Sequence, residues 1–265
     1  TPAGSRLMSL DFFRGFTIAA MILVNNPGSW THVYPPLLHA NWHGWTPTDL
    51  IFPFFLFIVG VSITLAFSAK KESHLPPQAL YLKIIRRTFI LFSLGLFLSG
   101  FPFFDIETLR IPGVLQRIAI CYFVAAILFI NSGVRTQALW AVGFMLIYWA
   151  AMQWFPVPGI GAGSYERGAN FSAWVDELLL HGHMWSQTKT WDPEGIFSTL
   201  PAIATTLFGV LTGHFLKRQV PVLKKVWMML IYGGIAIVIG SAWHYWLPIN
   251  KSLWTSSYTL FTAGM

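Results

Sequence analysis

The sequence predicts an all-α fold, a polytopic bundle of transmembrane helices. Of its 265 residues, 55% are hydrophobic and only 10% are charged, whereas soluble domains carry about 25% charged residues. The apolar residues gather in runs of about 20, the length that an α-helix needs to cross the hydrocarbon core of a bilayer. Aromatic residues make up 17%, which is typical of proteins that anchor at two membrane–water interfaces.

Seven apolar runs are long enough to span a bilayer, and an eighth begins near Trp254 and reaches Met265. We therefore treat residues 1–265 as a single transmembrane domain with about eight visible spans. The seven longer runs are Leu7–Asn25, Asp49–Phe67, Leu80–Leu98, Ile111–Ile130, Gln137–Trp154, Ile196–Phe215 and Val226–Trp246.

Lysine and arginine indicate the orientation, because they accumulate on the cytoplasmic side of membrane proteins. With the N-terminus in the cytoplasm, 12 of the 17 basic residues fall at inner ends and in inner loops. Arg110, Arg167, Lys189 and Lys251 fall outside, and Arg117 lies within a span. We predict a cytoplasmic N-terminus. The inner twelve are Arg6, Arg14, Lys70, Lys71, Lys83, Arg86, Arg87, Arg135, Lys217, Arg218, Lys224 and Lys225.

Two of the predicted outer connections are long, and long ordered loops usually serve function. Pro27–Pro47 joins the first two spans and is rich in histidine and tryptophan. Residues 155–192 join the fifth and sixth spans as an extracytoplasmic loop. Within it, apolar Trp174 and Leu178 recur at helical spacing and predict a short helix over Phe171–Leu180. We expect this helix to lie along the outer interface.

Composition argues against several partners. The formal charge of +7 does not indicate nucleic-acid binding, because the basic residues fall in short clusters between apolar runs. Cys121 is the only cysteine, so no disulfide forms within the chain. His39 and His43 are four residues apart, but Gly44 and Pro47 argue against a helix there and no third metal ligand stands out. We predict no nucleic acid and no metal.

Several cations lie in or near the spans. Arg14 follows Asp11 on the same helical face, so it either forms a local ion pair or neutralises an anionic ligand from the cytoplasm. Arg117, beside Gln116, lies too deep in its span to face lipid and should face the bundle interior or a polar cavity. The inner end of the third span carries a cationic face that is either a positive-inside marker or a phosphate site: Lys83, Arg86 and Arg87.

Polar residues also mark the predicted outer ends. His39 and His43 suit proton transfer near neutral pH, although loop histidines are more often interface residues. The amide of Asn25 closes the first span, where it caps the helix or turns the chain unless it serves a site.

Acidic residues precede two of the spans. Thr48 is expected to cap the second span, with Asp49 at its positive end. Asp192 is expected to cap the sixth, with Pro193 at its first position. Alternatively, Asp49, Asp192 and Glu194 line an outer mouth and hold a cationic group of a substrate.

Several of these segments resemble the heparan-α-glucosaminide N-acetyltransferase family and its bacterial relatives. The block that contains His39 is specific, whereas the Asp-x-x-Arg-Gly piece also occurs in other membrane acyltransferase-like families. Members of the family continue through further membrane helices, so we expect the chain to be truncated at its C-terminus. The matching segments keep their order: Ser9–Gly15, Val24–Asn25, His39–Thr46, Asp49–Pro53, Arg110–Arg117, Tyr165 onward into Asp192–Ile196, and Leu247–Trp254.

The resemblance implies acetyl transfer from cytoplasmic acetyl-CoA to the amine of a glucosamine-type sugar across the membrane. The family's active histidine falls on His39, as general base or acetyl acceptor. Its partner falls on Asn25, which would donate to the carbonyl oxygen. We assign the donor to Arg14, Lys83, Arg86, Arg87, Gln116 and Arg117. We assign the sugar to Trp42, Trp45, Asp49, Asp192 and Glu194. A passage through the bundle past Arg14 is expected to connect the two.

Two other classes compete with the enzyme. A transporter or ion-coupled carrier shares the helical bundle and the intramembrane charges, but no internal repeat is evident and the polar residues cluster in an outer loop instead of at the midplane. A structural subunit without chemistry does not account for Arg117. We predict an integral, multi-pass protein of the bacterial cytoplasmic membrane, with homo-oligomerisation left open.

Overall fold

The computed structural model describes residues 7–72 and 77–265, without the side chains of residues 69–77. Over these residues the regular structure is helical, and extended pairing is limited to isolated bridges. The all-α prediction is therefore confirmed. The helices are α1 (Met8–Asn25), η1 (Pro35–Leu37), η2 (Pro47–Leu50), α2 (Ile51–Glu72), α3 (Pro77–Gly100), α4 (Val114–Asn131), α5 (Val134–Trp154), α6 (Phe171–Leu180), α7 (Thr199–Lys217), α8 (Val222–Trp243) and α9 (Ser256–Gly264).

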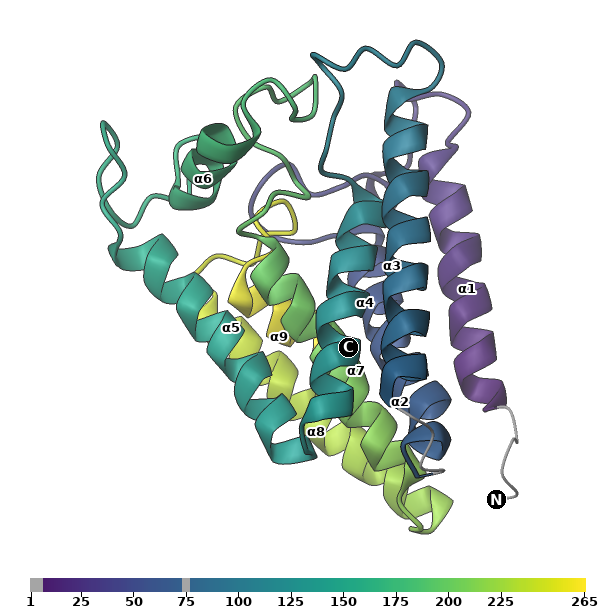
Figure 1. Ribbon diagram of the computed structural model, residues 1–265. Helices are drawn as coiled ribbons and strands as arrows, with labels where there is room; N and C mark the ends of the chain where they lie inside the picture. Colours follow the sequence, from purple (N-terminus) through teal and green to yellow (C-terminus); the bar gives the residue numbers. More distant parts are fainter. Residues whose placement is uncertain (1–6, 73–76) are drawn as a thin grey trace.

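Helices occupy all eight positions that the apolar runs predict (Figure 1). Among the described residues, five segments are long and apolar enough to cross a membrane: α1, Pro47–Ser68, α4, α7 and α8. The protein is therefore an integral membrane protein. Helices α3 and α5 have 24 and 21 residues, and α9 has nine. The total of about eight spans stays a prediction.

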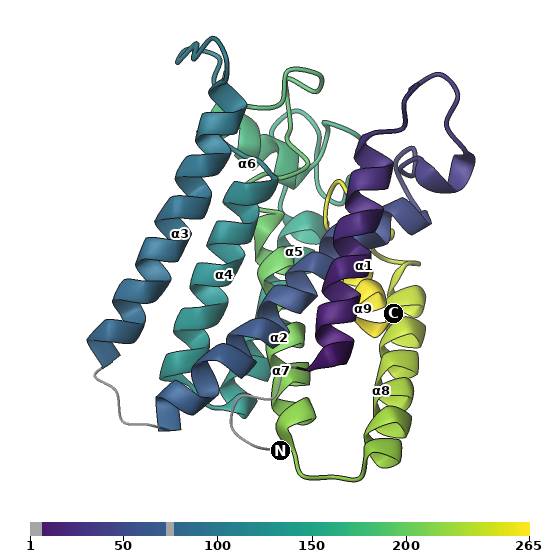
Figure 2. The same cartoon turned by 90° about the vertical axis from the view of Figure 1, so that its right-hand side faces the viewer.

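Helices α2 and α7 pack against each other at the centre of the bundle (Figure 2). Their backbones touch through two glycines. A Cβ atom on Gly60 would lie 1.9 Å from the carbonyl oxygen of Thr206, and one on Gly209 would lie 2.0 Å from that of Phe57. The hydroxyl of Thr64 donates to the carbonyl of Val210 at 3.0 Å. Small residues that allow close backbone approach are typical of membrane helix pairs.

This crossing predicts a large effect of one methyl group. Gly60→Ala must push α2 away from α7, and overpacking of this kind costs about 3 kcal/mol. We expect a clearly lower melting temperature in detergent, measured by intrinsic fluorescence. Gly143→Ala in α5 is the matched control, because nothing lies within 4 Å of its Cβ position. Equal melting temperatures for the two variants would show that the helices do not cross at Gly60.

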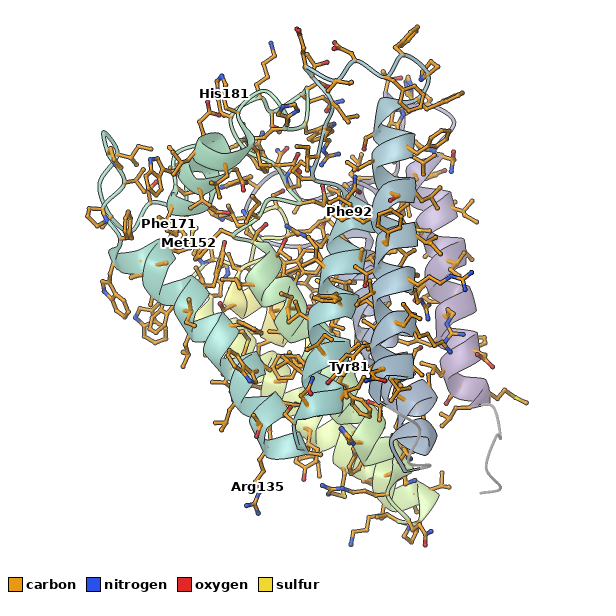
Figure 3. The ribbon with its side chains drawn as sticks, viewed as in Figure 1. Tyr81, Phe92, Arg135, Met152, Phe171 and His181 are labelled. Carbon is orange, nitrogen blue, oxygen red and sulfur yellow. The ribbon has the colours of Figure 1, made fainter. Side chains whose placement is uncertain are left out.

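The connections gather at opposite ends of the bundle. His181 lies at one end and Arg135 at the other (Figure 3). The long connections α1–α2, α3–α4, α5–α7 and α8–α9 lie at the His181 end (Figures 1 and 2). The short α4–α5 and α7–α8 connections lie at the Arg135 end, with basic residues at or beside them: Arg135, Lys217, Arg218, Lys224 and Lys225.

This distribution agrees with the charge grouping on which the predicted orientation rests, and the orientation itself stays a prediction. Arg6, also counted among the inner cations, lies outside the described residues, as do the side chains of Lys70 and Lys71.

Two elements face outward. Only Gly240 is buried on α8, so its apolar side chains cover the surface, as expected for contact with lipid. Helix α6 has the predicted bounds, and the side chain of Asn170 caps it by accepting the N–H of Ala173 at 3.0 Å. Leu178 and Leu179 on α6 are exposed. Its position at the membrane interface stays a prediction.

Candidate active site

A cavity of about 710 Å³ lies where the long connections meet. Its volume falls within the range of small-molecule sites. All four long connections contribute charged or aromatic side chains to its wall: His39, Trp42, Arg110, Arg167, Trp185, Trp191, Glu194 and Lys251.

Contacts between these connections close the wall of the cavity. The indole N–H of Trp42 donates to the carbonyl of Tyr165 at 2.9 Å, and the ring of Trp42 meets that of Trp191 edge-on at 5.1 Å. On the other side, the N–H of Gly44 donates to the carbonyl of Ile249 at 2.8 Å. The α1–α2 connection is thereby held between the α5–α7 and α8–α9 connections.

His39 and Asp49 form a dyad in this wall. Nδ1 of His39 lies 2.7 Å from Oδ1 of Asp49. The His39 side chain is 52% exposed and that of Asp49 is 1% exposed. Oδ2 of Asp49 accepts the N–H groups of Ala40 at 3.0 Å and Thr46 at 2.9 Å. Because this carboxylate accepts at both oxygens, it holds a proton on Nδ1 of His39, and in the neutral imidazole Nε2 then keeps its lone pair.

The helix start around Asp49 differs from the prediction. Thr46, not Thr48, is the N-cap of η2, and the hydroxyl of Thr48 donates back to the carbonyl of Pro36 at 3.1 Å. The expected cap was wrong because Pro47 occupies the first helical position, which moves the cap one residue ahead of it. Asp49 thus serves the helix start through Oδ2 and His39 through Oδ1.

Asp192 and Glu194 both bind Arg110, which lines the same cavity. Asp192 is buried and accepts Nε of Arg110 at 2.8 Å and Nη2 at 2.6 Å. Glu194 accepts Nη2 of Arg110 at 2.6 Å and lines the cavity. These carboxylates raise the pKa of Arg110 against the opposing effect of burial. The prediction that Asp192 caps the sixth span was wrong: Ser198 is the N-cap of α7, because Asp192 begins a separate turn before the helix, in which its carbonyl accepts the N–H of Gly195 at 2.9 Å.

Asp176 of α6 holds this acidic turn in place. Its carboxylate accepts the N–H of Ile196 at 2.9 Å and that of Asp192 at 3.3 Å. Burial raises the pKa of Asp176 to about 7. Helix α6 therefore positions the segment that presents Glu194 to the cavity.

The paired guanidinium of Arg110 predicts a stability effect. Arg110→Met leaves Asp192 charged, buried and unpaired, which costs about 3 kcal/mol. We expect a marked fall in melting temperature in detergent. Arg167→Met serves as the control, since Arg167 pairs with no carboxylate among the described residues. If both variants melt at the same temperature as the parent, Arg110 does not hold the acidic turn.

The predicted donor-binding residues lie away from this cavity. Arg14 is ion-paired with Asp11 at 3.2 Å, as one alternative predicted, and also donates to Ser62 of α2 at 3.0 Å. Lys83 and Arg86 lie on the exposed surface of α3. Arg87 lies over the ring of Tyr122 at 5.1 Å and lines a second cavity of about 110 Å³ between α2, α3 and α4. The two cavities share no lining residue, so the expected connecting passage stays a prediction.

Arg117 faces the bundle interior, as predicted. It is 1% exposed, and its guanidinium lies 5.2 Å from the ring of Trp254. Nη2 donates to the carbonyl of Gly195 at 3.1 Å and to the hydroxyl of Ser198. Nε and Nη1 of Arg117, and Nε2 of the adjacent buried Gln116, have no hydrogen-bond partner within the described part of the chain.

The remaining predicted residues divide by location. Trp42 lines the cavity. The ring of Trp45 packs on that of Phe261 of α9 at 5.1 Å, and Trp45 does not line the cavity. Asn25 ends α1 as an exposed residue and does not line the cavity either. The structure therefore groups His39, Trp42, Asp49 and Glu194, and leaves Asn25 and Trp45 outside the group.

Three cations of the cavity had no role in the sequence analysis: Arg110, Arg167 and Lys251 line it. Arg167 lies over the ring of Trp42 at 5.0 Å and donates to the carbonyl of Asn41. Nζ of Lys251 lies 3.3 Å from both ring nitrogens of His39. The only sequence signal for Arg110 and Lys251 was their place in the matching segments.

Comparison with known proteins identifies the family of the chain. The family described as "Heparan-alpha-glucosaminide N-acetyltransferase, catalytic" matches residues 6–240. The chain belongs to the heparan-α-glucosaminide N-acetyltransferase family. It is 29% identical to the protein of that name from Mus musculus, over 97% of this chain and 47% of the mouse protein. It is 28% identical to the Homo sapiens protein, over 96% of this chain and 46% of the human one.

The chain thus spans about half the length of the curated heparan-α-glucosaminide N-acetyltransferases that it matches. The family match includes His39, Asp49, Arg110 and Glu194. Lys251 lies beyond the matched residues 6–240, although it reaches the same cavity.

Proposed function

We propose that this protein transfers an acetyl group from acetyl-CoA to the amine of a glucosamine-type sugar. The dyad of His39 and Asp49, in the wall of a cavity of about 710 Å³, carries the proposal. Membership of the heparan-α-glucosaminide N-acetyltransferase family supports it. An amine must lose a proton to form an amide, and Nε2 of His39 is a base directed by a buried carboxylate.

The cavity wall offers contacts suited to the acceptor. Trp42, Trp185 and Trp191 provide aromatic surface, against which the apolar faces of a sugar ring can pack. Glu194 supplies a carboxylate for hydroxyl or ammonium groups. We infer that the acceptor amine lies against His39 and that the ring lies toward Trp191.

The acetyl donor is proposed to come from the cytoplasmic side. The guanidinium groups of Arg86 and Arg87 form no ion pair with a described carboxylate, which leaves them suited to phosphates. The small cavity that Arg87 lines also supports a donor site at this face. Because CoA is large and polyanionic, holding its nucleotide at that face costs less than moving the whole molecule across the bilayer.

The activity is tested with purified protein in detergent, given acetyl-CoA labelled in the acetyl group and glucosamine. We expect labelled N-acetylglucosamine to form in proportion to protein. Uptake of glucosamine into vesicles without acetylation would instead identify a carrier. Absence of both would remove the proposed function.

Sidedness is tested separately in sealed proteoliposomes, with acetyl-CoA outside and glucosamine trapped inside. The acetyl-CoA for this experiment is labelled in its adenine. We expect acetylated sugar inside the vesicles and the adenine label outside them. Product that forms only when both substrates share one side would contradict transfer across the membrane while leaving the acetyltransferase activity intact.

A further inference from the structure

Lys251 lies in a hydrogen-bonded turn between α8 and α9. Fully buried Asn250 holds this turn: its side-chain oxygen accepts the N–H of Leu253 at 2.9 Å, and its carbonyl accepts that of Thr255 at 3.2 Å. The hydrogen bond from Gly44 to Ile249 joins the turn to the connection that carries His39. The position of the lysine relative to the dyad is therefore set by buried backbone contacts.

The ammonium group of Lys251 contacts the imidazole of His39 without occupying the lone pair of Nε2. Equal distances of 3.3 Å from Nζ to Nδ1 and Nε2 place the ammonium on the plane midway between the two nitrogens, not in line with the lone pair of Nε2. Nε2 stays available to a substrate proton. Since Lys251 also lines the cavity, its N–H donors can reach a substrate atom held against His39.

Burial and nearby charges shift the pKa of Lys251, and the pKa affects its strength as a hydrogen-bond donor. Burial lowers its pKa from the ordinary value, and nearby Arg117 acts in the same direction. The carboxylates of Glu194 and Asp49 oppose the shift. A lowered pKa strengthens the hydrogen bond that an ammonium gives to a developing negative charge.

The proposed reaction needs such a donor. The attacking amine forms a C–N bond with the thioester carbon, and the electron pair of the C=O bond moves to oxygen. The amine proton passes to Nε2 of His39. The electron pair on oxygen then re-forms the C=O bond of the amide as the C–S bond breaks. The sulfur leaves with the C–S electron pair, takes up the proton from Nε2 and departs as the CoA thiol. The site must stabilise the negative charge that the carbonyl oxygen carries in the tetrahedral intermediate.

Asn25 was expected to supply this stabilisation, but it does not line the cavity. Arg110 is engaged by Asp192 and Glu194. We propose that Lys251 is the catalytic residue that donates to the carbonyl oxygen as its negative charge develops. This assignment rests on the proposed acetyl transfer and adds to it a charged donor from a connection far along the chain.

The test compares Lys251→Met and Lys251→Arg with the parent protein in the detergent assay. Loss of one donor to an oxyanion costs about 100-fold in kcat. We expect that loss for Lys251→Met, with the KM for acetyl-CoA nearly unchanged, and partial recovery for Lys251→Arg because it keeps a cation. Lys224→Met, on the exposed surface of α8 at the opposite end, is the matched control and should retain the parent rate.

A binding measurement separates this role from a structural one. The probe is a bisubstrate compound in which a tetrahedral methylphosphonyl group joins the CoA sulfur to the glucosamine nitrogen. Lys251→Met should weaken its binding about 100-fold while leaving S-ethyl-CoA, which lacks the carbonyl, unaffected. An unchanged kcat, or a loss confined to the KM for glucosamine, would overturn the assignment. If the parent protein itself transfers no acetyl group, the proposed function fails instead.

Discussion

Replacing His39 with alanine is expected to lower kcat for acetyl transfer by about 10⁴-fold, because the variant has no base to accept the amine proton. Folding should be preserved, since the His39 side chain is half exposed and its removal opens no buried cavity. The measurement is the rate of labelled N-acetylglucosamine formation in detergent, together with the melting temperature and binding of S-ethyl-CoA.

A matched control lies on the same connection. His32 is exposed and does not line the cavity, and within the described part of the chain its hydrogen bond is to neighbouring Thr31, so His32→Ala should retain the parent rate. Because the site of His39 opens to solvent, added imidazole should restore part of the activity of His39→Ala and none to the Lys251→Met variant. Turnover of His39→Ala near the parent rate would eliminate the dyad as the reacting centre.

The second large effect is expected for Asp49→Asn. The N–H groups of Ala40 and Thr46 donate to Oδ2 of Asp49, so the amide oxygen of the asparagine must take that place. Its NH₂ group then faces Nδ1 of His39 and donates to it. This forces the proton of the imidazole onto Nε2, which removes the base while the shape of the site is kept. Changes of this kind cost about 10³-fold or more in kcat.

The same variant separates two roles of Asp49, as helix cap and as partner of His39. A cap role alone predicts a loss of about 1 kcal/mol in stability and little change in kcat. A dyad role predicts the opposite: little change in stability and a large loss in kcat. Melting temperature and turnover measure the two quantities. Asp105→Asn is the control, because Asp105 also accepts a backbone N–H in a turn but does not line the cavity. A parent-like kcat for Asp49→Asn would reduce Asp49 to a cap.

Local patterns in the sequence were enough to predict the helices. Apolar runs located α1 to α5 and α7 to α9, and helical spacing located α6 with its observed bounds. The periodicity of apolar residues reports on one element at a time, so it predicts each element well. Cap preferences failed at Thr48 and Asp192, where Pro47 and a separate turn before α7 placed the caps elsewhere. The resemblance to a family, not periodicity, pointed to His39.

What the sequence by itself determined is therefore a helical membrane protein of this family, with a histidine of interest in a long connection. Only the tertiary structure decided which side chains meet that histidine. Lys251 is 212 positions away from His39 along the chain, and the partner of Arg110 is 82 positions away. Such pairs depend on how four connections fold over the end of the bundle. That packing gives buried carboxylates such as Asp49 and Asp192 their partners, and no local pattern records which partners they meet.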